Sequence, residues 1–137
     1  MRIADLAARR VAVWGFGREG RAALAALQAR LPDSKFAVFC SDAESNGVRG
    51  AADAMTTPPD SAALSAFDVV IKSPGISAYR PEIIEAQHNG TKFTSGTALW
   101  FAEHPQARVI AVTGTKGKST VSALIAHFLR ALGRRTA

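Results

Sequence analysis

The segment that most constrains the fold of this chain runs from residue 109 to residue 120. It reads Val-Ile-Ala-Val-Thr-Gly-Thr-Lys-Gly-Lys-Ser-Thr, and an apolar helical pattern follows it as far as Gly133. A buried strand, a Gly-Lys-Ser loop and a helix in this order are typical of a phosphate-binding loop. The glycines let backbone N–H groups turn toward an anion, and the helix N-terminus adds partial positive charge. The segment therefore predicts a nucleoside triphosphate as ligand.

Residues within this loop have distinct expected roles. Lys118 is expected to reach the outer phosphates of ATP, and the Ser119 hydroxyl is expected to bind Mg²⁺. The predicted ATP-binding residues are Gly114, Thr115, Lys116, Gly117, Lys118, Ser119 and Thr120. The general motif has glycine where Val112 stands, so the match is incomplete. A solvated turn between a strand and a helix is the alternative interpretation of these residues.

A second glycine-rich turn lies near the N-terminus. Residues 10–14, which are apolar after Arg10, predict a buried strand, the turn Gly15-Phe16-Gly17-Arg18-Glu19-Gly20 follows, and residues 22–27 predict a helix. Strand, Gly-x-Gly-x-x-Gly and helix open the dinucleotide-binding folds, in which an anion lies at the helix N-terminus. By itself the glycine pattern is a weak signal, because a tight packing turn also produces it.

Further strands and helices alternate along the chain. Strands are expected at 35–40, 68–72 and 92–95, and helices at 62–67, 81–88 and 97–103. This alternation predicts an α/β, Rossmann-like fold, in which a parallel sheet has helices on both faces. Ligands bind at the carboxyl ends of such strands, where this sequence has Ser41 and Asp42, and then Ser73-Pro74-Gly75. A role for Asp42 as a helix or turn cap is nearly as plausible as a role in binding.

The net charge of +6 is distributed unevenly. All acidic residues lie at or before Glu103, where an equal number of basic residues balances them. The excess therefore belongs to the last part of the chain, where two lysines lie in the phosphate loop and three arginines at or after a helix C-terminus. We accordingly expect no nucleic-acid partner. We also expect two parts, namely a complete domain at 1–106 and the start of a truncated ATP-binding domain at 107–137.

Hydropathy and cysteine content bear on the compartment. No apolar run approaches the roughly 20 residues that span a bilayer, and the N-terminus lacks the apolar block of a signal peptide. Cys40 is the single cysteine, so no internal disulfide can form. These features predict a cytoplasmic protein without a membrane partner.

The two phosphate-binding loops stand about a hundred residues apart with Ser73-Pro74-Gly75 between them, and this combination resembles the Mur ligase family. The chain is most similar to members that join glutamate to UDP-N-acetylmuramoyl-L-alanine in peptidoglycan synthesis, using ATP and an acyl phosphate. The resemblance implies that Gly15, Phe16, Gly17, Arg18 and Glu19 line the pyrophosphate, that Ser41 and Asp42 face the uracil, and that Ser73, Pro74 and Gly75 face the sugar diphosphate. It also implies that Lys118 is catalytic, that Ser119 and Thr120 help to hold ATP and Mg²⁺, and that the parent protein is monomeric.

Some residues depart from the family pattern. Lys116 stands where asparagine is common, and Arg18-Glu19 stand where small or neutral residues are common. These departures leave open whether the added amino acid is D-glutamate or L-glutamate. A NAD(P)-binding oxidoreductase domain and a non-catalytic nucleotide-binding module are the alternatives from other classes. Asp42, 22 positions after Gly20, is compatible with NAD, but an oxidoreductase offers no reason for the second loop.

Overall fold

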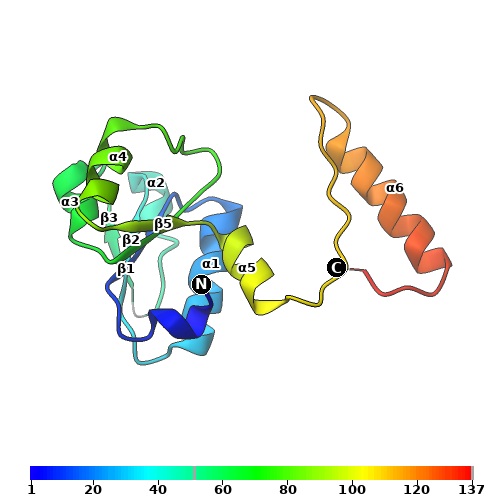
Figure 1. Cartoon of the computed structure of the whole chain (residues 1–137), viewed down its shortest axis with the longest axis horizontal. Helices are drawn as coiled ribbons and strands as arrows, with labels where there is room; N and C mark the ends of the chain where they lie inside the picture. The colour runs from blue at the N-terminus through cyan, green and yellow to red at the C-terminus, as the bar shows by residue number, and fades with distance from the viewer. Residues whose placement is uncertain (51, 137) are drawn as a thin grey trace. The chain divides into compact units, whose positions relative to one another are not determined.

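The computed structural model describes residues 1–50 and 52–136 and divides into two compact units (Figure 1). Unit 1 comprises Met1–Pro105, and unit 2 comprises Gln106–Ala137.

Unit 1 is built on a parallel sheet of five strands in the order β3-β2-β1-β4-β5. The strands are β1 (Val11–Trp14), β2 (Phe36–Phe39), β3 (Ala52–Met55), β4 (Val69–Lys72) and β5 (Lys92–Thr94). The chain builds outward from β1 to β3 and then returns to β4 on the other side of β1. Trp14 lies in register with Phe39 on one side and with Lys72 on the other. The carboxyl ends of three strands are therefore level at the point where the strand order reverses, which is where open α/β sheets bind ligands.

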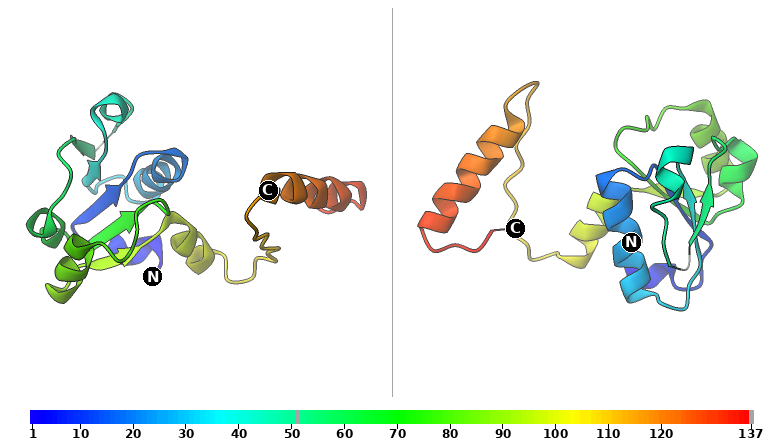
Figure 2. Two further views of the ribbon diagram at one scale, coloured as in Figure 1. Left: turned by 90° about the horizontal axis from the view of Figure 1, so that it is seen from above. Right: turned by 180° about the vertical axis from the view of Figure 1, so that it is seen from behind.

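Helices cover both faces of this sheet (Figures 1 and 2). The helices of unit 1 are the 3₁₀ helix η1 (Ile3–Leu6) and the α-helices α1 (Arg18–Arg30), α2 (Asp42–Ser45), α3 (Ser61–Ser65), α4 (Pro81–His88) and α5 (Gly96–Glu103). One face packs against α1, α5 and η1, and the other against α3 and α4. The predicted Rossmann-like fold is thus confirmed.

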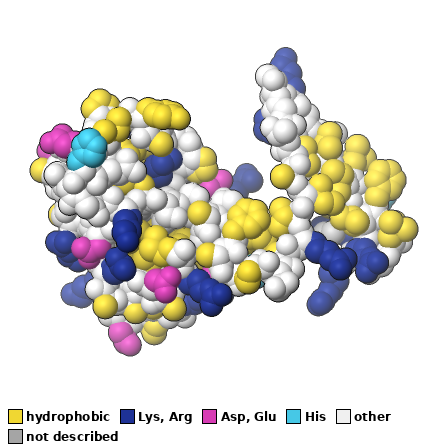
Figure 3. Space-filling model, in the orientation of Figure 1, with side chains coloured by type: hydrophobic (Ala, Val, Ile, Leu, Met, Phe, Trp, Pro, Cys, Tyr) yellow, Lys and Arg dark blue, Asp and Glu magenta, His cyan; other side chains and the backbone are white. Residues whose placement is uncertain are grey.

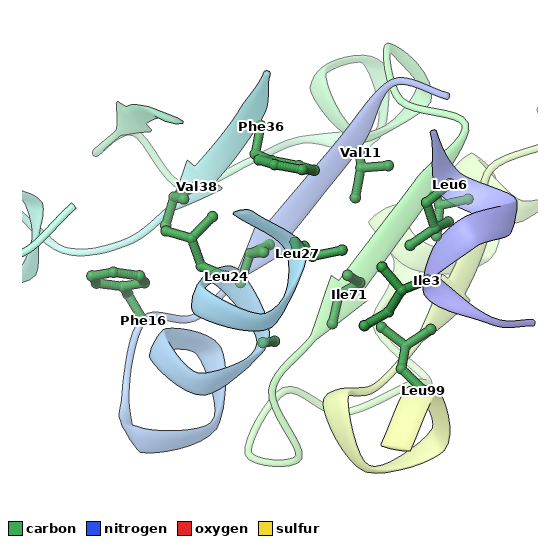
Figure 4. Packing of buried hydrophobic residues seen from close by; sticks show 13 residues of the cluster. Ile3, Leu6, Val11, Phe16, Leu24, Leu27, Phe36, Val38, Ile71 and Leu99 are labelled. Carbon is green, nitrogen blue, oxygen red and sulfur yellow. The ribbon is translucent and has the colours of Figure 1, made fainter. Parts of the chain in front are cut away.

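The two cores follow from the alternation of side chains along β1. Val11 and Val13 face α1, where Leu24 and Leu27 are almost completely buried (Figure 4). Ala12 and Trp14 belong to the second cluster, which α3 and α4 supply with Leu64, Ile83 and Ala86. Because the central strand of a covered parallel sheet is buried on both faces, its sequence is a continuous apolar run.

The predicted elements of unit 1 lie close to the observed ones, with three omissions. Helix α4 begins and ends at the predicted residues. Strand β3 was not predicted, because its sequence Ala-Asp-Ala-Met contains no apolar run, and three of its four residues are exposed at the sheet edge. Its hydrogen bonds to β2 hold it in the sheet. The short helices η1 and α2 were also missed.

Unit 2 contains the predicted helix, α6 (Lys118–Ala131), but residues 109–112 do not form the predicted strand. A strand of a sheet is held by hydrogen bonds to a neighbouring strand, and the described part of unit 2 contains none. Apolar side chains consequently lie exposed, with Ile110 at 59% and Phe128 at 62% exposure. Figure 3 shows hydrophobic side chains gathered over α6. Within the described residues, every helix is too short or too polar to cross a membrane.

Candidate functional site

Three loops meet where β1, β2 and β4 end. Gly15, directly after β1, has a φ of +89°, a left-handed conformation that favours glycine. Its N–H donates to the carbonyl of Phe39 at 2.8 Å. The Ser73 N–H donates to the carbonyl of Trp14 at 2.9 Å, and the Ser73 hydroxyl donates to the carbonyl of Gly15 at 3.1 Å. The Gly-x-Gly-x-x-Gly turn and the Ser73-Pro74-Gly75 loop, 58 residues apart, therefore form one hydrogen-bonded structure.

The glycines of this structure fall into two kinds. A methyl group on Gly20 would lie 1.9 Å from the Gly15 carbonyl oxygen, and one on Gly15 would lie 2.7 Å from the Ser73 hydroxyl oxygen. These two glycines are required by the packing of the protein itself. Gly17 and Gly75 have no atom of residues 1–50 or 52–136 within 4 Å of the corresponding position. Their missing side chains leave space that no described residue occupies, as a closely approaching ligand would require.

The N-terminus of α1 is the electropositive part of this region. Gly17 is the N-cap, and no side chain of the described residues caps the helix. Among the described residues, the N–H groups of 16–20 donate to no protein acceptor. Free N–H groups together with the helix dipole favour an anion at this end of α1.

The side chains of the glycine turn lie in three different environments. Phe16 is 3% exposed and belongs to the core, so only its backbone is available to a ligand. Arg18 is exposed to solvent. Glu19 lies on the side of α1 that faces α5, where it borders an apolar hollow of about 380 Å³. Glu19 also borders the small gap between Gly20, Ser73 and the end of β4. Glu19 itself is exposed, and it borders both hollows from the first turn of α1.

The loop after β2 contains the short helix α2. Ser41 is its N-cap, and both the N–H and the hydroxyl of Ser41 donate to Glu44 Oε2, at 3.1 and 2.8 Å. These bonds, the backbone one first, hold the pKa of Glu44 below its ordinary value. Asp42, by contrast, is exposed, and no hydrogen bond to its carboxylate is formed by the described residues. The cap of α2 is therefore Ser41, and the carboxylate of Asp42 is available to a ligand.

The loop after β4 is held by two further contacts. The Ile76 N–H donates to the Ser73 carbonyl at 3.1 Å, which closes a turn around Pro74 and Gly75. The Lys72 ammonium donates to the Ile76 carbonyl at 2.9 Å. Sequence reasoning did not assign Lys72 a role, and its position as the last residue of a strand before Ser-Pro-Gly was the available signal.

Arg21 is a second residue of this region that sequence reasoning missed. Its Nε donates to the Phe16 carbonyl at 3.1 Å, and its guanidinium carbon lies 5.2 Å from the centre of the Phe16 ring. The available signal was a long basic side chain in the first turn of the helix that follows the glycines, from which it reaches back to the turn. The apolar hollow between α1 and α5 had no signal in the sequence.

Unit 2 contains the Gly-Lys-Ser loop. Gly114 and Gly117 have positive φ values of 148° and 77°. Gly117 is the N-cap of α6, and no side chain in the described part of the chain caps this helix. The Lys118 ammonium lies back over the loop and donates to the Gly114 carbonyl at 2.6 Å. Within the described chain no residue other than glycine has a positive φ, so Val112 takes its place in the motif without left-handed strain. Lys116, Ser119 and Thr120 are exposed around the helix N-terminus.

Comparison with known proteins identifies relatives along the whole chain. No family model matches the sequence. A UDP-N-acetylmuramoyl-L-alanine–L-glutamate ligase of Xanthomonas axonopodis pv. citri is 53% identical over 145 aligned residues, which cover 100% of this chain. Proteins of the same name from Xylella fastidiosa and a Micromonospora species are 48% and 43% identical over 100% and 98% of the chain. The chain spans about 31% of the length of the relatives from Xanthomonas and Xylella.

Proposed function

Because this chain belongs to the Mur ligase family, we propose that it supplies the UDP-substrate site and the ATP phosphate loop of a peptidoglycan precursor ligase. The whole protein would join L-glutamate to UDP-N-acetylmuramoyl-L-alanine. The choice of L-glutamate rests on relatives that are 43% to 53% identical and are named for that amino acid.

One observation in unit 1 carries the proposal. The free N–H groups at the start of α1 lie at the reversal of strand order, where Ser73 is bonded to Gly15. A diphosphate at this helix N-terminus would be bound by backbone donors and the helix dipole. Asp42 would then accept a hydrogen bond from the uracil, and the loop around Gly75 would lie against the sugar diphosphate.

Unit 2 offers residues that fit the phosphates of ATP. Gly114 and Gly117 shape the loop, which leads directly into the N-terminus of α6. Backbone N–H groups in the first turn of α6 are available there to a phosphate. Lys118, already folded over the loop, would exchange its bond with the Gly114 carbonyl for one with a phosphate. Mg²⁺ held by Ser119 and phosphate oxygens would offset negative charge.

The proposed reaction forms the amide bond in two steps. The carboxylate of the UDP-linked substrate attacks the γ-phosphoryl group of ATP, giving an acyl phosphate and ADP. The amine of glutamate then displaces phosphate. In the first step Lys118 would stabilise the charge on the phosphoryl group as it is transferred. We place this reaction in the cytoplasm, in keeping with a single free thiol at Cys40.

Ligand titration distinguishes this proposal from a NAD-binding domain. We expect UDP-N-acetylmuramoyl-L-alanine to shift the backbone amide NMR signals of 15–20, 41–42, 73 and 75 in the 137-residue chain. NAD should shift the same signals only at much higher concentration. Both ligands carry a diphosphate that would bind at the N-terminus of α1. Tighter binding of NAD than of the UDP-linked substrate would therefore overturn the ligase proposal.

A further inference from the structure

Arg21 connects α1 to the glycine turn that precedes the helix. Its Nε donates to the Phe16 carbonyl, and its guanidinium lies over the Phe16 ring. The guanidinium has five N–H donors in a planar group, so it can donate through Nε while it stacks on an aromatic face. The Phe16 side chain is itself fixed in the core of unit 1.

The same guanidinium reaches the loop that follows α2. A methyl group on Gly47 would lie 3.4 Å from Arg21 Nη2 and 3.4 Å from Phe16 Cε1, so Gly47 lies beside both side chains. The next residue, Val48, packs against the same core cluster. The charge of Arg21 also contributes, after the hydrogen bonds from Ser41, to the lowered pKa of Glu44. Arg21 thus bonds to the segment that follows β1 and lies beside the segment that follows β2.

The bond to the Phe16 carbonyl has a consequence for the anion site. A peptide group is planar and trans, so its carbonyl and its N–H point in opposite directions. Because Arg21 draws the Phe16 carbonyl toward itself, the Gly17 N–H points away from Arg21. That N–H donates to no acceptor among residues 1–50 and 52–136. Arg21 therefore holds the Phe16 carbonyl oxygen, which would repel an anion, on the side opposite to the Gly17 N–H, which would attract one.

We infer that Arg21 is a positioning residue that couples the two halves of a nucleoside diphosphate site, by tying the glycine turn that holds the diphosphate to the loop that holds the base. This inference rests on the proposed function, since it assigns the base to the loop after β2. Its new content is that the Arg21 side chain alone aligns the diphosphate subsite with the base subsite, without touching either the base or the diphosphate.

The test compares UDP with its two halves, uridine and pyrophosphate, by NMR titration of the 137-residue chain. Arg21→Ala should weaken UDP binding about tenfold, and binding of either half less than twofold. Each half fills one subsite, which the variant retains, whereas only UDP needs both subsites in register. Arg21→Lys should also weaken UDP binding, because an ammonium keeps the charge but cannot both stack on Phe16 and donate sideways.

Arg30→Ala is the matched control, because it removes one positive charge from the last turn of the same helix. Arg30 pairs with Glu103, far along α1 from the glycine turn. Binding of UDP by this variant should equal that of the wild type. Amide hydrogen exchange without ligand gives a second measurement. Residues 44–48 should exchange faster in Arg21→Ala than in the wild type or in Arg30→Ala.

The outcomes separate this inference from the proposed function. A wild-type chain that does not bind UDP would overturn the proposed function, and the inference with it. If the wild type binds UDP and Arg21→Ala binds it equally well, only the inference fails. Equal losses for UDP and for pyrophosphate would also refute it, because Arg21 would then act as a simple phosphate charge or fold stabiliser. Should Arg21→Ala fail to fold, Arg21→Lys carries the same comparison.

Discussion

Substitution of Gly20 by alanine tests whether the third glycine of the turn is required by the protein and not by a ligand. The added methyl group would lie 1.9 Å from the Gly15 carbonyl oxygen and 3.0 Å from its carbonyl carbon. An ordinary carbon–oxygen contact is more than an ångström longer than the first distance. The obstructing atoms belong to the backbone, so no side-chain rotation can relieve the overlap. Either α1 must move away from the sheet or the turn must change shape.

The expected cost follows from the packing of α1. Leu24 and Leu27 fix the helix against β1, so a shift of α1 also disturbs the core. Overpacking in a well-packed site costs about 1–3 kcal/mol, and a clash with backbone belongs at the upper end, about 3 kcal/mol. A domain of this size has about 5–15 kcal/mol of stability in total. The midpoint of thermal unfolding should therefore fall by about 12–24 °C, at 4–8 °C per kcal/mol.

Gly17→Ala is the control, because no atom of the described residues lies within 4 Å of its added methyl group. Its cost should be near 1 kcal/mol or less, the loss of a glycine N-cap. Urea denaturation followed by the fluorescence of buried Trp14 measures both variants. Gly17→Ala should instead weaken UDP binding, because its methyl group enters the open space. A Gly20→Ala protein within 1 kcal/mol of the wild type would refute the reasoning.

Two further predictions concern acid stability and ATP turnover. Asp68 accepts hydrogen bonds from the side chain and the backbone N–H of Arg10, and these bonds hold the pKa of Asp68 below its ordinary value of 3.8. The ionised carboxylate therefore stabilises the folded state above pH 3.8. This stabilisation is lost as the pH falls through the lowered pKa. Urea titrations at pH 2–7 should show Asp68→Asn less stable than the wild type at pH 6, with the difference shrinking toward pH 2; a constant difference would contradict this linkage. The 137-residue chain should not hydrolyse ATP, because no paired strand in the described part of unit 2 supports the loop; turnover by preparations free of contaminating ATPase would contradict this.

Regular periodicity in unit 1 was sufficient to predict most of its fold. Central strands such as β1 are continuous apolar runs because both faces are covered, and Pro81 with Asn89-Gly90 defined both ends of α4. Strand β3 could not be predicted in the same way. Its place at the edge depends on pairing with β2, which is a contact distant in sequence. The strand predicted at 109–112 failed for the related reason that its apolar residues have no paired neighbour in the described part of unit 2.

The candidate site shows the same division between local and distant information. The glycine turn and the loop at Ser73 were each visible in the sequence as local patterns. The observed strand order explains why they meet, because β1 and β4 are neighbours in the sheet. The bond from Ser73 to Gly15 joins residues 58 positions apart, so no local pattern could reveal it. The glycine pattern likewise could not show that the Phe16 side chain belongs to the core, because its burial depends on packing against α1 and the sheet.

The two lysines of the Gly-Lys-Ser loop should differ sharply in their effect on ATP use. The Lys118 ammonium already lies over the loop at the Gly114 carbonyl, whereas the exposed Lys116 side chain makes no hydrogen bond to the described residues. A charge-assisted contact with phosphate contributes about 1.5–3 kcal/mol, which is about ten- to a hundredfold in affinity or rate. In the whole ligase, Lys118→Ala should lose at least this much in kcat/KM for ATP, and Lys116→Asn should change it less than twofold. A tenfold loss in Lys116→Asn would place that ammonium on the phosphates and contradict its assignment to solvent. An unaffected Lys118→Ala enzyme would remove the basis for treating the loop as a phosphate site at all.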